Sequence, residues 1–361
     1  MENKTKYSVT FFGTADDYDY VGNFHEGFAY VRNNYKEKKV GYIDKDGNLI
    51  IPLEYYGGFE RLSGRRMDTP SFFSQGLAGL CKGDKCGFVD GTDSVVIPFE
   101  YDDVYFFSED LAAVRKNSGW GFINKAGEIV IPLEYEWAYY FSEGLAPVKK
   151  NGKFGYIDKT GAPVIPIELE YDYAGPFCGG LAQVSAGVGE IIKSDNESIA
   201  EFQKRHSEAL KNQLWGVIDK SGKLVSQLKH GTETFKEGLR VVSENGKYYY
   251  TDTAGNQPFR GGFDDAWHFN NGLAWVKING KYGLTDKTGR LVMSAEAGYE
   301  PAGNFHGGFA AVKKDNKYGY IDLTGNIVVP TEYDLAGSVN ESLAVAEKDG
   351  KWAVIKFDYD L

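Results

Sequence analysis

The apolar and polar positions of this chain follow a pattern of short β-strands separated by tight turns. In residues 145–150, LAPVKK, apolar side chains alternate with other residues, as they do in a strand with one buried face. Asn151-Gly152 follows, a pair that favours a type I′ hairpin turn because both positions of that turn need a positive φ. Residues 153–159, KFGYIDK, are then predicted to form the returning strand of a β-hairpin.

A second turn and a third strand complete this segment. Asp158 is expected to hold the turn through its side chain, and Gly161 to take the left-handed backbone conformation. The next strand, residues 163–166 (PVIP), ends at a proline, which cannot donate to a β-ladder and so suits a strand end or a sheet edge. Three short strands, or four if residues 137–141 (WAYYF) also pair, cannot bury their own apolar face. Such a unit needs neighbours that stack on it.

Two motifs of this segment recur nine times along the chain in the same order. The first is typified by Phe-Ser-Glu-Gly-Leu-Ala and begins at residues 24, 73, 107, 141, 177, 235, 269, 305 and 339. The second is typified by Trp-Gly-Phe-Ile-Asn and begins at residues 40, 86, 120, 154, 215, 248, 282, 318 and 352. Most neighbouring copies of the first motif start 34 or 36 residues apart. The whole chain, residues 1–361, is therefore predicted to be a single all-β array of nine tandem repeats.

The repeating unit resembles the WG repeat, also called the WG-containing or KWG repeat. The shared features are Gly-Leu-Ala-x-Val, a turn, Lys-Trp/Phe/Tyr-Gly-Tyr-Ile-Asp, a second turn, Val-Ile-Pro and Glu-Tyr-Asp, and they are clearest in residues 107–172 and 305–334. Residues 224–233, 256–265 and 291–300 depart from this pattern, since they lack the proline or the Glu-Tyr pair. The resemblance implies a β-repeat architecture found in many bacterial proteins, a scaffold or binding role, and no catalytic residues.

Two arrangements of the repeats fit the sequence. In a closed, propeller-like ring, the start of the chain often completes the last sheet. The chain ends just after the second strand of its ninth repeat, and residues 6–20 (KYSVTFFGTADDYDY) offer the missing third strand, which favours the ring. An open, curved β-solenoid is the alternative, because the repeats are short for four-stranded blades and nine exceeds the usual four to eight.

The longer of two insertions lies near residues 186–213. Ser194 and Glu197 form a capping-box pattern, and an apolar stripe that includes Phe202 follows it. A helix is therefore predicted near residues 194–212, which either packs on the array or projects toward a partner.

The other insertion, near residues 57–72, is locally basic within an acidic protein. Arg61, Arg65 and Arg66 suit a contact with an anion or an acidic peptide, because the guanidinium group matches carboxylate and phosphate geometry. A solvated loop is the alternative interpretation.

Composition and charge narrow the class of partner. Aromatic residues make up 15% of the chain, which favours β-structure, and the formal net charge of −11 argues against a nucleic-acid partner. The sequence contains no apolar run that is typical of a signal peptide or a membrane span, so a cytoplasmic location without membrane contact is expected.

Three cysteines do not describe a disulfide framework. Cys81 and Cys86 flank a short turn, and a bridge between them is geometrically possible, but free thiols are expected in a reducing compartment.

Catalytic and metal-binding motifs are missing from the sequence. It has no nucleophile elbow, Gly-rich phosphate loop, HExxH or paired-cysteine zinc spacing. The repeated Asp-x-x-Gly is explained by the turns, and its spacing does not fit a calcium loop. The protein is therefore expected not to be an enzyme, and to need neither a metal nor a cofactor.

Three tryptophans lie outside the repeating aromatic position that Trp120, Trp215 and Trp352 occupy. They are Trp137, Trp267 and Trp275. Exposed tryptophans commonly anchor partners or stack on sugars, so these three, with Phe202 and the three arginines, are the candidate binding residues. Core packing is the alternative for each tryptophan.

The sequence favours a non-catalytic scaffold that binds a protein or peptide, because repeat arrays offer extended surfaces whose turns tolerate substitution. A module that binds a small molecule or a carbohydrate through exposed aromatic rings is the alternative.

Overall fold

The computed structural model describes residues 6–33, 39–57, 59–61, 65–67, 72–187, 214–225, 229–230, 236–252 and 255–358. In this part of the chain the regular structure is β, apart from one turn of 3-10 helix, η1 (Ala295–Ala297), which confirms the all-β prediction. The chain forms two compact units. Unit 1 combines Met1–Leu53 with Thr234–Leu361, and unit 2 is Glu54–Glu233.

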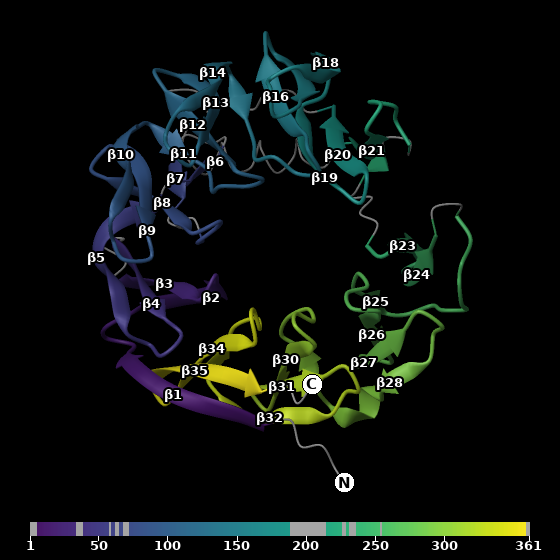
Figure 1. Ribbon diagram of the computed structural model, residues 1–361. Coiled ribbons are helices and arrows are strands. Elements are labelled where there is room, and N and C mark those ends of the chain that lie inside the picture. Colours follow the sequence, from purple (N-terminus) through teal and green to yellow (C-terminus); the bar gives the residue numbers. More distant parts are fainter. Residues whose placement is uncertain are drawn as a thin grey trace, which may run out of the picture. The chain divides into compact units, whose positions relative to one another are not determined.

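A typical repeat of unit 2 is a four-stranded antiparallel sheet whose strands follow one another in chain order (Figure 1). In one such sheet the inner strand, β15 (Trp137–Ala138), is short, β16 (Ala146–Lys150) and β17 (Lys153–Ile157) form a hairpin, and β18 (Pro163–Leu169) is the outer strand. Trp137 pairs with Lys149 and Ala138 with Val148, so the fourth strand that the sequence left open is present.

The remaining strands of unit 2 keep this order. They are β6 (Phe59–Arg61), β7 (Arg65–Met67), β8 (Leu77–Lys82), β9 (Lys85–Asp90), β10 (Val95–Tyr101), β11 (Asp103–Val104), β12 (Leu111–Lys116), β13 (Gly119–Asn124), β14 (Ile129–Tyr135), β19 (Tyr173–Cys178), β20 (Leu181–Ala186), β21 (Leu214–Asp219) and β22 (Lys229–His230). The strand β5 (Leu49–Gly57) contains the boundary between the units, and its residues Tyr56 and Gly57 pair with Cys81 and Leu80 of β8.

Unit 1 is built from sheets of the same kind. Its strands, besides β5, are β1 (Lys6–Thr14), β2 (Tyr20–His25), β3 (Phe28–Asn33), β4 (Lys39–Asp44), β23 (Arg240–Glu244), β24 (Lys247–Thr251), β25 (Asp265–Ala266), β26 (Leu273–Ile278), β27 (Lys281–Asp286), β28 (Leu291–Met293), β29 (Glu300–Pro301), β30 (Phe309–Lys314), β31 (Lys317–Asp322), β32 (Ile327–Tyr333), β33 (Leu335–Ala336), β34 (Leu343–Lys348) and β35 (Lys351–Asp358).

Both predicted turns of the repeat are present. Asn151 and Gly152 have φ values of 52° and 76°, as a type I′ hairpin requires. The carboxylate of Asp158 accepts hydrogen bonds from the backbone N–H groups of Thr160 (2.8 Å) and Ala162 (3.0 Å). The turn residues therefore act through neighbours in the sequence, which is why the pattern alone predicts them.

The glycine of the second repeating motif is required by a close approach of two strands. The outer strand β14 shifts register against β13 between Trp120 and Phe122, which brings its backbone over Gly121. A Cβ on Gly121 would lie 2.5 Å from the carbonyl oxygen of Ile131. Only glycine lets the outer strand pack this closely.

The core of unit 2 is shared between neighbouring repeats. One buried cluster combines Phe122 and Ile131 of one sheet with Phe141 and Val148 of the next. All four side chains are at most 1% exposed. This sharing confirms, inside the unit, that a repeat buries its apolar face against its neighbour.

The turn after each inner strand also joins neighbouring repeats of unit 2. The hydroxyl of Ser142 donates to the carbonyl oxygen of Phe177 in the next repeat (2.7 Å). The carboxylate of Glu143 accepts the backbone N–H of Gly180 (3.0 Å) and pairs with Lys220 (3.2 Å). Glu143 itself has a φ of 54°, so a strained turn residue is held in place by bonds to the next repeat.

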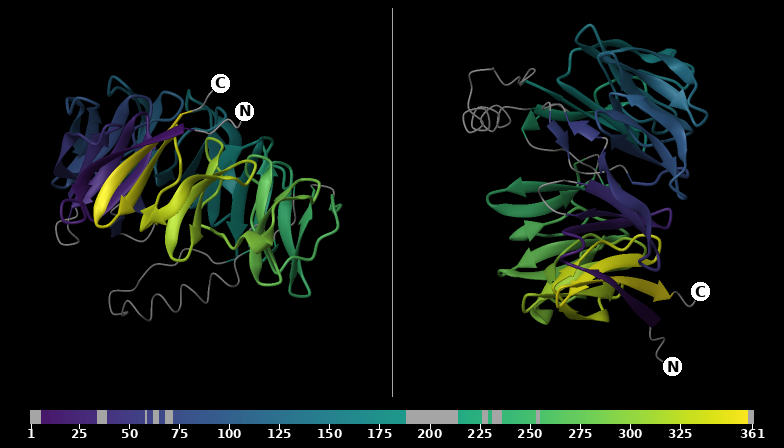
Figure 2. Two further views of the ribbon diagram at one scale, coloured as in Figure 1. Left: turned by 90° about the horizontal axis from the view of Figure 1, so that it is seen from below. Right: turned by 90° about the vertical axis from the view of Figure 1, so that its left-hand side faces the viewer.

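In unit 1 the first and ninth repeats are in direct contact. The N-terminal strand β1 lies antiparallel to β35, with Lys6 opposite Asp358 and Thr14 opposite Lys351. Figures 1 and 2 show this strand, in purple, beside the yellow C-terminal strands. The sheet order is β1-β35-β34-β33, so residues 6–14 provide the outer strand of the ninth repeat. Glu341 of the ninth repeat accepts the backbone N–H of Gly27 of the first repeat (2.7 Å).

Cys81 and Cys86 are joined by a disulfide bond, and both are buried. The expectation of free thiols at these positions is therefore wrong. The two residues are directly opposite each other on β8 and β9, which brings their side chains together on the same face of the hairpin. Cys178 is a free and exposed cysteine.

Two sequence predictions fall wholly or partly beyond this description. The helix predicted near residues 194–212 lies outside the described residues. Arg61, Arg65 and Arg66 belong to the hairpin β6–β7, in which Arg61 pairs with Arg65. Among the described residues, none belongs to a helix of the length and apolar character needed to cross a membrane.

Candidate functional site

Five aromatic rings of unit 2 form a continuous row, here called the aromatic stack. Its members, in order of contact, are Phe72, Phe106, Tyr140, Tyr139 and Trp137. The ring centroids of successive members lie 4.6, 4.7, 4.4 and 5.4 Å apart. All five residues are half-buried. The row crosses three successive repeats.

The repeat itself positions these rings. Phe106 and Tyr140 each precede a fully buried phenylalanine, Phe107 and Phe141, which anchors the segment in the core. The hydroxyl of Ser108 donates to the carbonyl oxygen of Phe141 (2.7 Å), which fixes the register of one segment against the next. Core packing and a hydrogen bond between repeats therefore hold the segments that carry the stack.

Each of the central rings contacts two other rings of the stack. Phe106 lies between Phe72 and Tyr140, with interplanar angles of 35° and 39°. Tyr140 lies between Phe106 and Tyr139, the latter at 36°. Phe106 and Tyr140 therefore each contact two other rings of the stack and remain half-buried.

Burial has an electrostatic effect on the hydroxyl of Tyr140. Burial, followed by the nearby Tyr139, Tyr173 and Cys178, raises the pKa of Tyr140 to about 12. The hydroxyl is therefore protonated at neutral pH and can donate a hydrogen bond.

The same position in unit 1 carries polar residues. The residue before the buried apolar anchor is Asn23, His268, Asn304 or Ser338 there, whereas it is Phe72, Phe106, Tyr140 or Pro176 in unit 2. Asn23, His268 and Asn304 are exposed. Because the fold accepts polar residues at this position, the aromatic residues of unit 2 are not explained by the fold alone.

Of the residues predicted for binding, Trp137 lies in the stack. It stacks on Tyr139 at an interplanar angle of 12° and meets Phe154 edge-on. Phe202 lies outside the described residues, and the arginines Arg61, Arg65 and Arg66 are described through their backbone alone. The binding roles predicted for these residues stay predictions.

Trp267 and Trp275 are packing residues of unit 1. Trp275 is 2% exposed, and its indole N–H donates to the carbonyl oxygen of Gly303 (3.3 Å). Trp267 is half-buried against the same cluster. Trp275 thus lies in the core, which is the alternative that the sequence left open, because it packs in the buried cluster that contains Leu284 and Phe305.

The stack residues Phe72, Phe106 and Tyr140 were missed by the sequence reasoning. That reasoning followed the tryptophans outside the repeating position. The signal that would have found them is an aromatic residue directly before the anchor phenylalanine in three successive repeats, against polar residues in most others.

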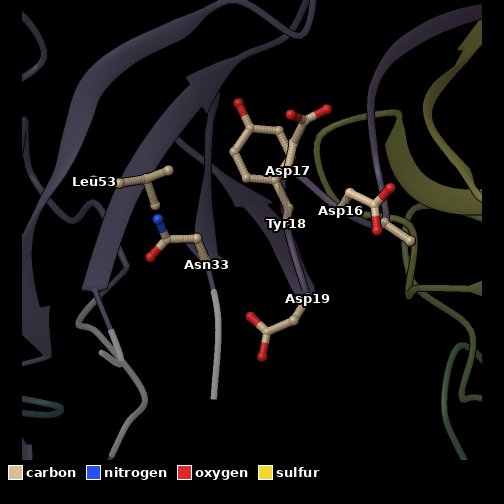
Figure 3. Close-up of a pocket in the computed structure, with 7 residues that line it drawn as sticks. Asp16, Asp17, Tyr18, Asp19, Asn33 and Leu53 are labelled. Carbon is tan, nitrogen blue, oxygen red and sulfur yellow. The ribbon is translucent and has the colours of Figure 1, made fainter. Parts of the chain in front are cut away.

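A pocket of about 610 Å³ in unit 1 is the second candidate site (Figure 3). It is lined by Ala15, Asp16, Asp17, Tyr18, Asp19, Asn33 and Leu53. Asp19 pairs with Arg32 (3.2 Å), and Asp17 accepts the N–H (2.7 Å) and the hydroxyl (2.9 Å) of Thr14, which lowers the pKa of Asp17. These carboxylates hold the turn between β1 and β2. No group of three potential metal ligands is found among the described residues.

A family model described as the WG containing repeat matches the chain nine times. The matched residues are 17–36, 41–57, 87–119, 120–154, 154–187, 215–248, 260–282, 282–318 and 318–352. The chain belongs to the WG repeat family. Phe106 lies in the match 87–119 and Trp137, Tyr139 and Tyr140 lie in the match 120–154, whereas Phe72 lies between two matches. A comparison with curated proteins finds no match.

Solved structures are similar to this WG-repeat chain in fold. A eukaryotic initiation factor matches with a TM-score of 0.51 and 11% identity, over 91% of this chain and 93% of its own. The WD40 domain of SCAP from fission yeast matches with a TM-score of 0.41 and 9% identity, over 99% of both chains. The Neurospora crassa Pan2 WD40 domain matches with a TM-score of 0.34 and 10% identity, over 100% of this chain and 98% of its own. At 11% identity the likeness to the initiation factor concerns the fold alone.

Proposed function

We propose that this protein is a non-catalytic scaffold that binds a peptide segment of a protein partner on the aromatic stack of unit 2. The observation that carries the proposal is that Phe106 and Tyr140 are only half-buried at a position where unit 1 has polar residues. Partly exposed aromatic rings on a rigid support are typical of the residues that dominate binding energy at interfaces.

The geometry of the rings favours a peptide over a carbohydrate. A sugar packs its apolar face on an open aromatic face, and Phe106 and Tyr140 each already contact two other rings. A row of half-buried rings with a tyrosine hydroxyl instead suits side chains and carbonyl groups of a polypeptide. The carbohydrate alternative is thus less well supported.

The proposal includes no chemical step. Perturbed pKa values often mark catalytic groups. In the described part of the chain they fall mainly on buried tyrosines, such as Tyr156, and on carboxylates that hold turns or repeats, such as Asp158 and Glu143. Each of these shifts has a structural cause, which supports a binding role.

Two further parts of the sequence prediction belong to this proposal. The scaffold is proposed to act in the cytoplasm, and its repeats are proposed to close into a ring. The contact between the first and ninth repeats inside unit 1 supports closure. Small-angle scattering of the whole protein tests it, since an open array gives a larger maximum dimension than a ring.

A peptide selection tests the binding role. Random dodecapeptides displayed on phage are selected on the immobilised full-length protein. The selected peptides are then measured on wild type, on the double variant Phe106→Asn, Tyr140→Asn and on the control His268→Asn, which changes the equivalent position of unit 1. We expect affinities of about 1–100 μM for wild type, corresponding to roughly 5–8 kcal/mol, with at least tenfold weaker binding to the double variant and an unchanged control. The proposal would be wrong if no peptide were selected, or if the selected peptides bound the double variant and the control equally well.

A further inference from the structure

The hairpin β8–β9 carries a disulfide at two positions where other hairpins carry a cation above an aromatic ring. Cys81 and Cys86 are directly opposite each other on these strands. In the hairpin β12–β13 the equivalent residues are Arg115 and Trp120, and the guanidinium carbon lies 5.8 Å from the centroid of the indole ring. Three further hairpins in the described part of the chain share this arrangement, in the pairs Lys149–Phe154, Lys277–Tyr282 and Lys313–Tyr318. The second repeat thus joins by a covalent bond two strand positions that these repeats join by packing.

The cysteines also replace a large side chain in the core. Trp120 is 5% exposed and lies in a buried cluster with Tyr135, its partner on β14. Cys86 takes the corresponding place beside Tyr101, its partner on β10. A buried tryptophan contributes about 150–250 Å² of packed surface, far more than a cysteine does. The second repeat therefore gains less from packing at this position and depends more on the bond, which exists only in the oxidised state.

The surroundings of the two sulfurs also accept the reduced state. The Sγ atom of Cys86 lies 3.9 Å from the carbonyl oxygen of Asp102, so a thiol at this position has an acceptor for its weak S–H donor. The other neighbours in the buried cluster are apolar, and a free cysteine packs as a small hydrophobic residue. Reduction therefore removes the bond without leaving an unpaired charge in the core.

A reductant reaches the sulfurs when the end of the hairpin opens. Cys81 and Cys86 are 0% and 1% exposed. A single residue pair, Lys82 with Lys85, separates them from the turn, and residues 82–85 are all exposed. Opening one end of a hairpin costs much less free energy than unfolding the domain. Exchange with a dissolved thiol is thus possible in the folded protein.

We infer that Cys81 and Cys86 form a redox-sensitive lock on the second repeat, which is open as two thiols and closed as a disulfide. Closing removes two protons and two electrons from the thiols, and glutathione disulfide takes them up and leaves as two molecules of glutathione. Reduction runs through the same mixed disulfide in reverse. In the cytoplasm, the location proposed above, disulfides are usually transient and redox-sensing. The lock changes the stability of β8 and β9 whether or not the stack binds a peptide.

Hydrogen exchange of the full-length protein, equilibrated in buffers with different ratios of reduced to oxidised glutathione, tests this inference. Under reducing conditions the amides of residues 77–90 should exchange at least tenfold faster than under oxidising conditions. Those of residues 111–124, the hairpin with Arg115 and Trp120, should not change. Alkylation of the folded protein should show that the two thiols appear together. The melting temperature should fall by about 4–8 °C on reduction.

Three variants assign the response to this pair. Cys178→Ser removes the remaining cysteine and should keep the full response. Cys81→Ala with Cys86→Ala should exchange like reduced wild type in every buffer. Cys81→Arg with Cys86→Trp builds the pair of β12–β13 into this hairpin, and its exchange should not depend on glutathione. Thermal melting shows whether each variant is folded, and the alanine variant and wild type suffice for the comparison if the last variant is not.

Three results would overturn the inference. If the sulfurs stay unreactive in the folded protein at every glutathione ratio, the bridge is a permanent cross-link. If reduction leaves the exchange of residues 77–90 unchanged, the bond does not lock the repeat. If Cys178→Ser abolishes the response, a different cysteine causes it.

Discussion

The carboxylate of Glu341 accepts a 2.7 Å hydrogen bond from the backbone N–H of Gly27, a residue 314 positions earlier in the chain. The same kind of bond links Glu143 to Gly180 in neighbouring repeats of unit 2. The first and ninth repeats are thus linked by the same kind of hydrogen bond that links consecutive repeats.

Replacing Glu341 should loosen this joint. Glu341→Ala leaves the N–H groups of Glu26 and Gly27 without their acceptor. We expect a loss of about 1 kcal/mol, or a fall in melting temperature of about 2–4 °C, as for a partly exposed hydrogen bond to a charged group. Glu341→Gln, which keeps an acceptor oxygen, should lose less. The control is Glu332→Ala, which breaks an exposed ion pair with Lys348 (3.0 Å) and should change stability by less than about 0.5 kcal/mol.

The ninth repeat should need the N-terminal strand in order to fold, but that strand should work equally well when it is attached at the other end of the chain. Deleting residues 1–14 exposes the edge of β35 and uncovers the core against which Tyr7 and Val9 pack. We expect this deletion to give insoluble protein or a melting temperature lower by more than about 10 °C, because an open apolar edge is unstable. Moving the same residues behind residue 358 through a short Asn-Gly linker should restore folding, since β1 and β35 are antiparallel. A relocated strand that fails to restore folding would contradict this account.

The glycine of the WG motif should not tolerate a side chain. In Gly121→Ala the new Cβ meets backbone atoms of Ile131 and Pro132, which cannot move aside as a flexible side chain would. We expect a loss of about 1–3 kcal/mol, as for overpacking in a core. Gly303→Ala is the matched control, because its nearest atom lies 3.8 Å from the added Cβ. Chemical denaturation of both variants measures the difference, and equal stability would show that β14 can shift away.

Acid should destabilise the repeats through their turn aspartates. The hydroxyl of Thr288 is the main cause that lowers the pKa of Asp286 from 3.8 to about 2. N–H groups of Thr288 and Arg290 add to this effect, and desolvation opposes it in part. The pKa of Asp158 is lowered mainly by the hydroxyl of Thr160. A carboxylate whose pKa is lower in the folded state contributes stability above its ordinary pKa and loses it as the pH falls through the folded value. The loss should therefore run from about pH 4 to pH 2.

Thermal melts across this pH range check the prediction. The variant Asp286→Asn should show a shallower fall in melting temperature below pH 4 than wild type, because it lacks one group that must be protonated. A wild-type melting temperature that stays constant down to pH 2 would contradict the assigned role of these carboxylates.

The disulfide predicts a thiol count. Of the three cysteines, only Cys178 is free. In denaturant without reductant, Ellman's reagent should detect one thiol per chain, and after reduction it should detect three. Three thiols before reduction would show that the bridge does not form. Because the bridge closes a short loop, Cys81→Ala with Cys86→Ala should cost about 2 kcal/mol.

The parts of this fold that the sequence predicted are those that depend on neighbouring residues in the chain. Asn151-Gly152 and the Asp158 turn depend on the backbone preferences and side chains of adjacent residues, so each is visible in a few letters of sequence. Their repetition at a constant interval then indicated the all-β array and the family.

The tertiary structure decided the rest, most of which depends on residues one repeat or more apart. Phe106 and Tyr140 become one surface only when consecutive sheets stack, and Trp275 is turned into the core by the pairing of its strand. The register of β8 and β9 brings Cys81 and Cys86 together, and the bond from Gly27 to Glu341 needs both ends of the chain in place. The sequence by itself determined the repeating unit and its turns, since these are local. Which rings are exposed and which repeats touch was determined by packing, since contacts between distant residues leave no local pattern.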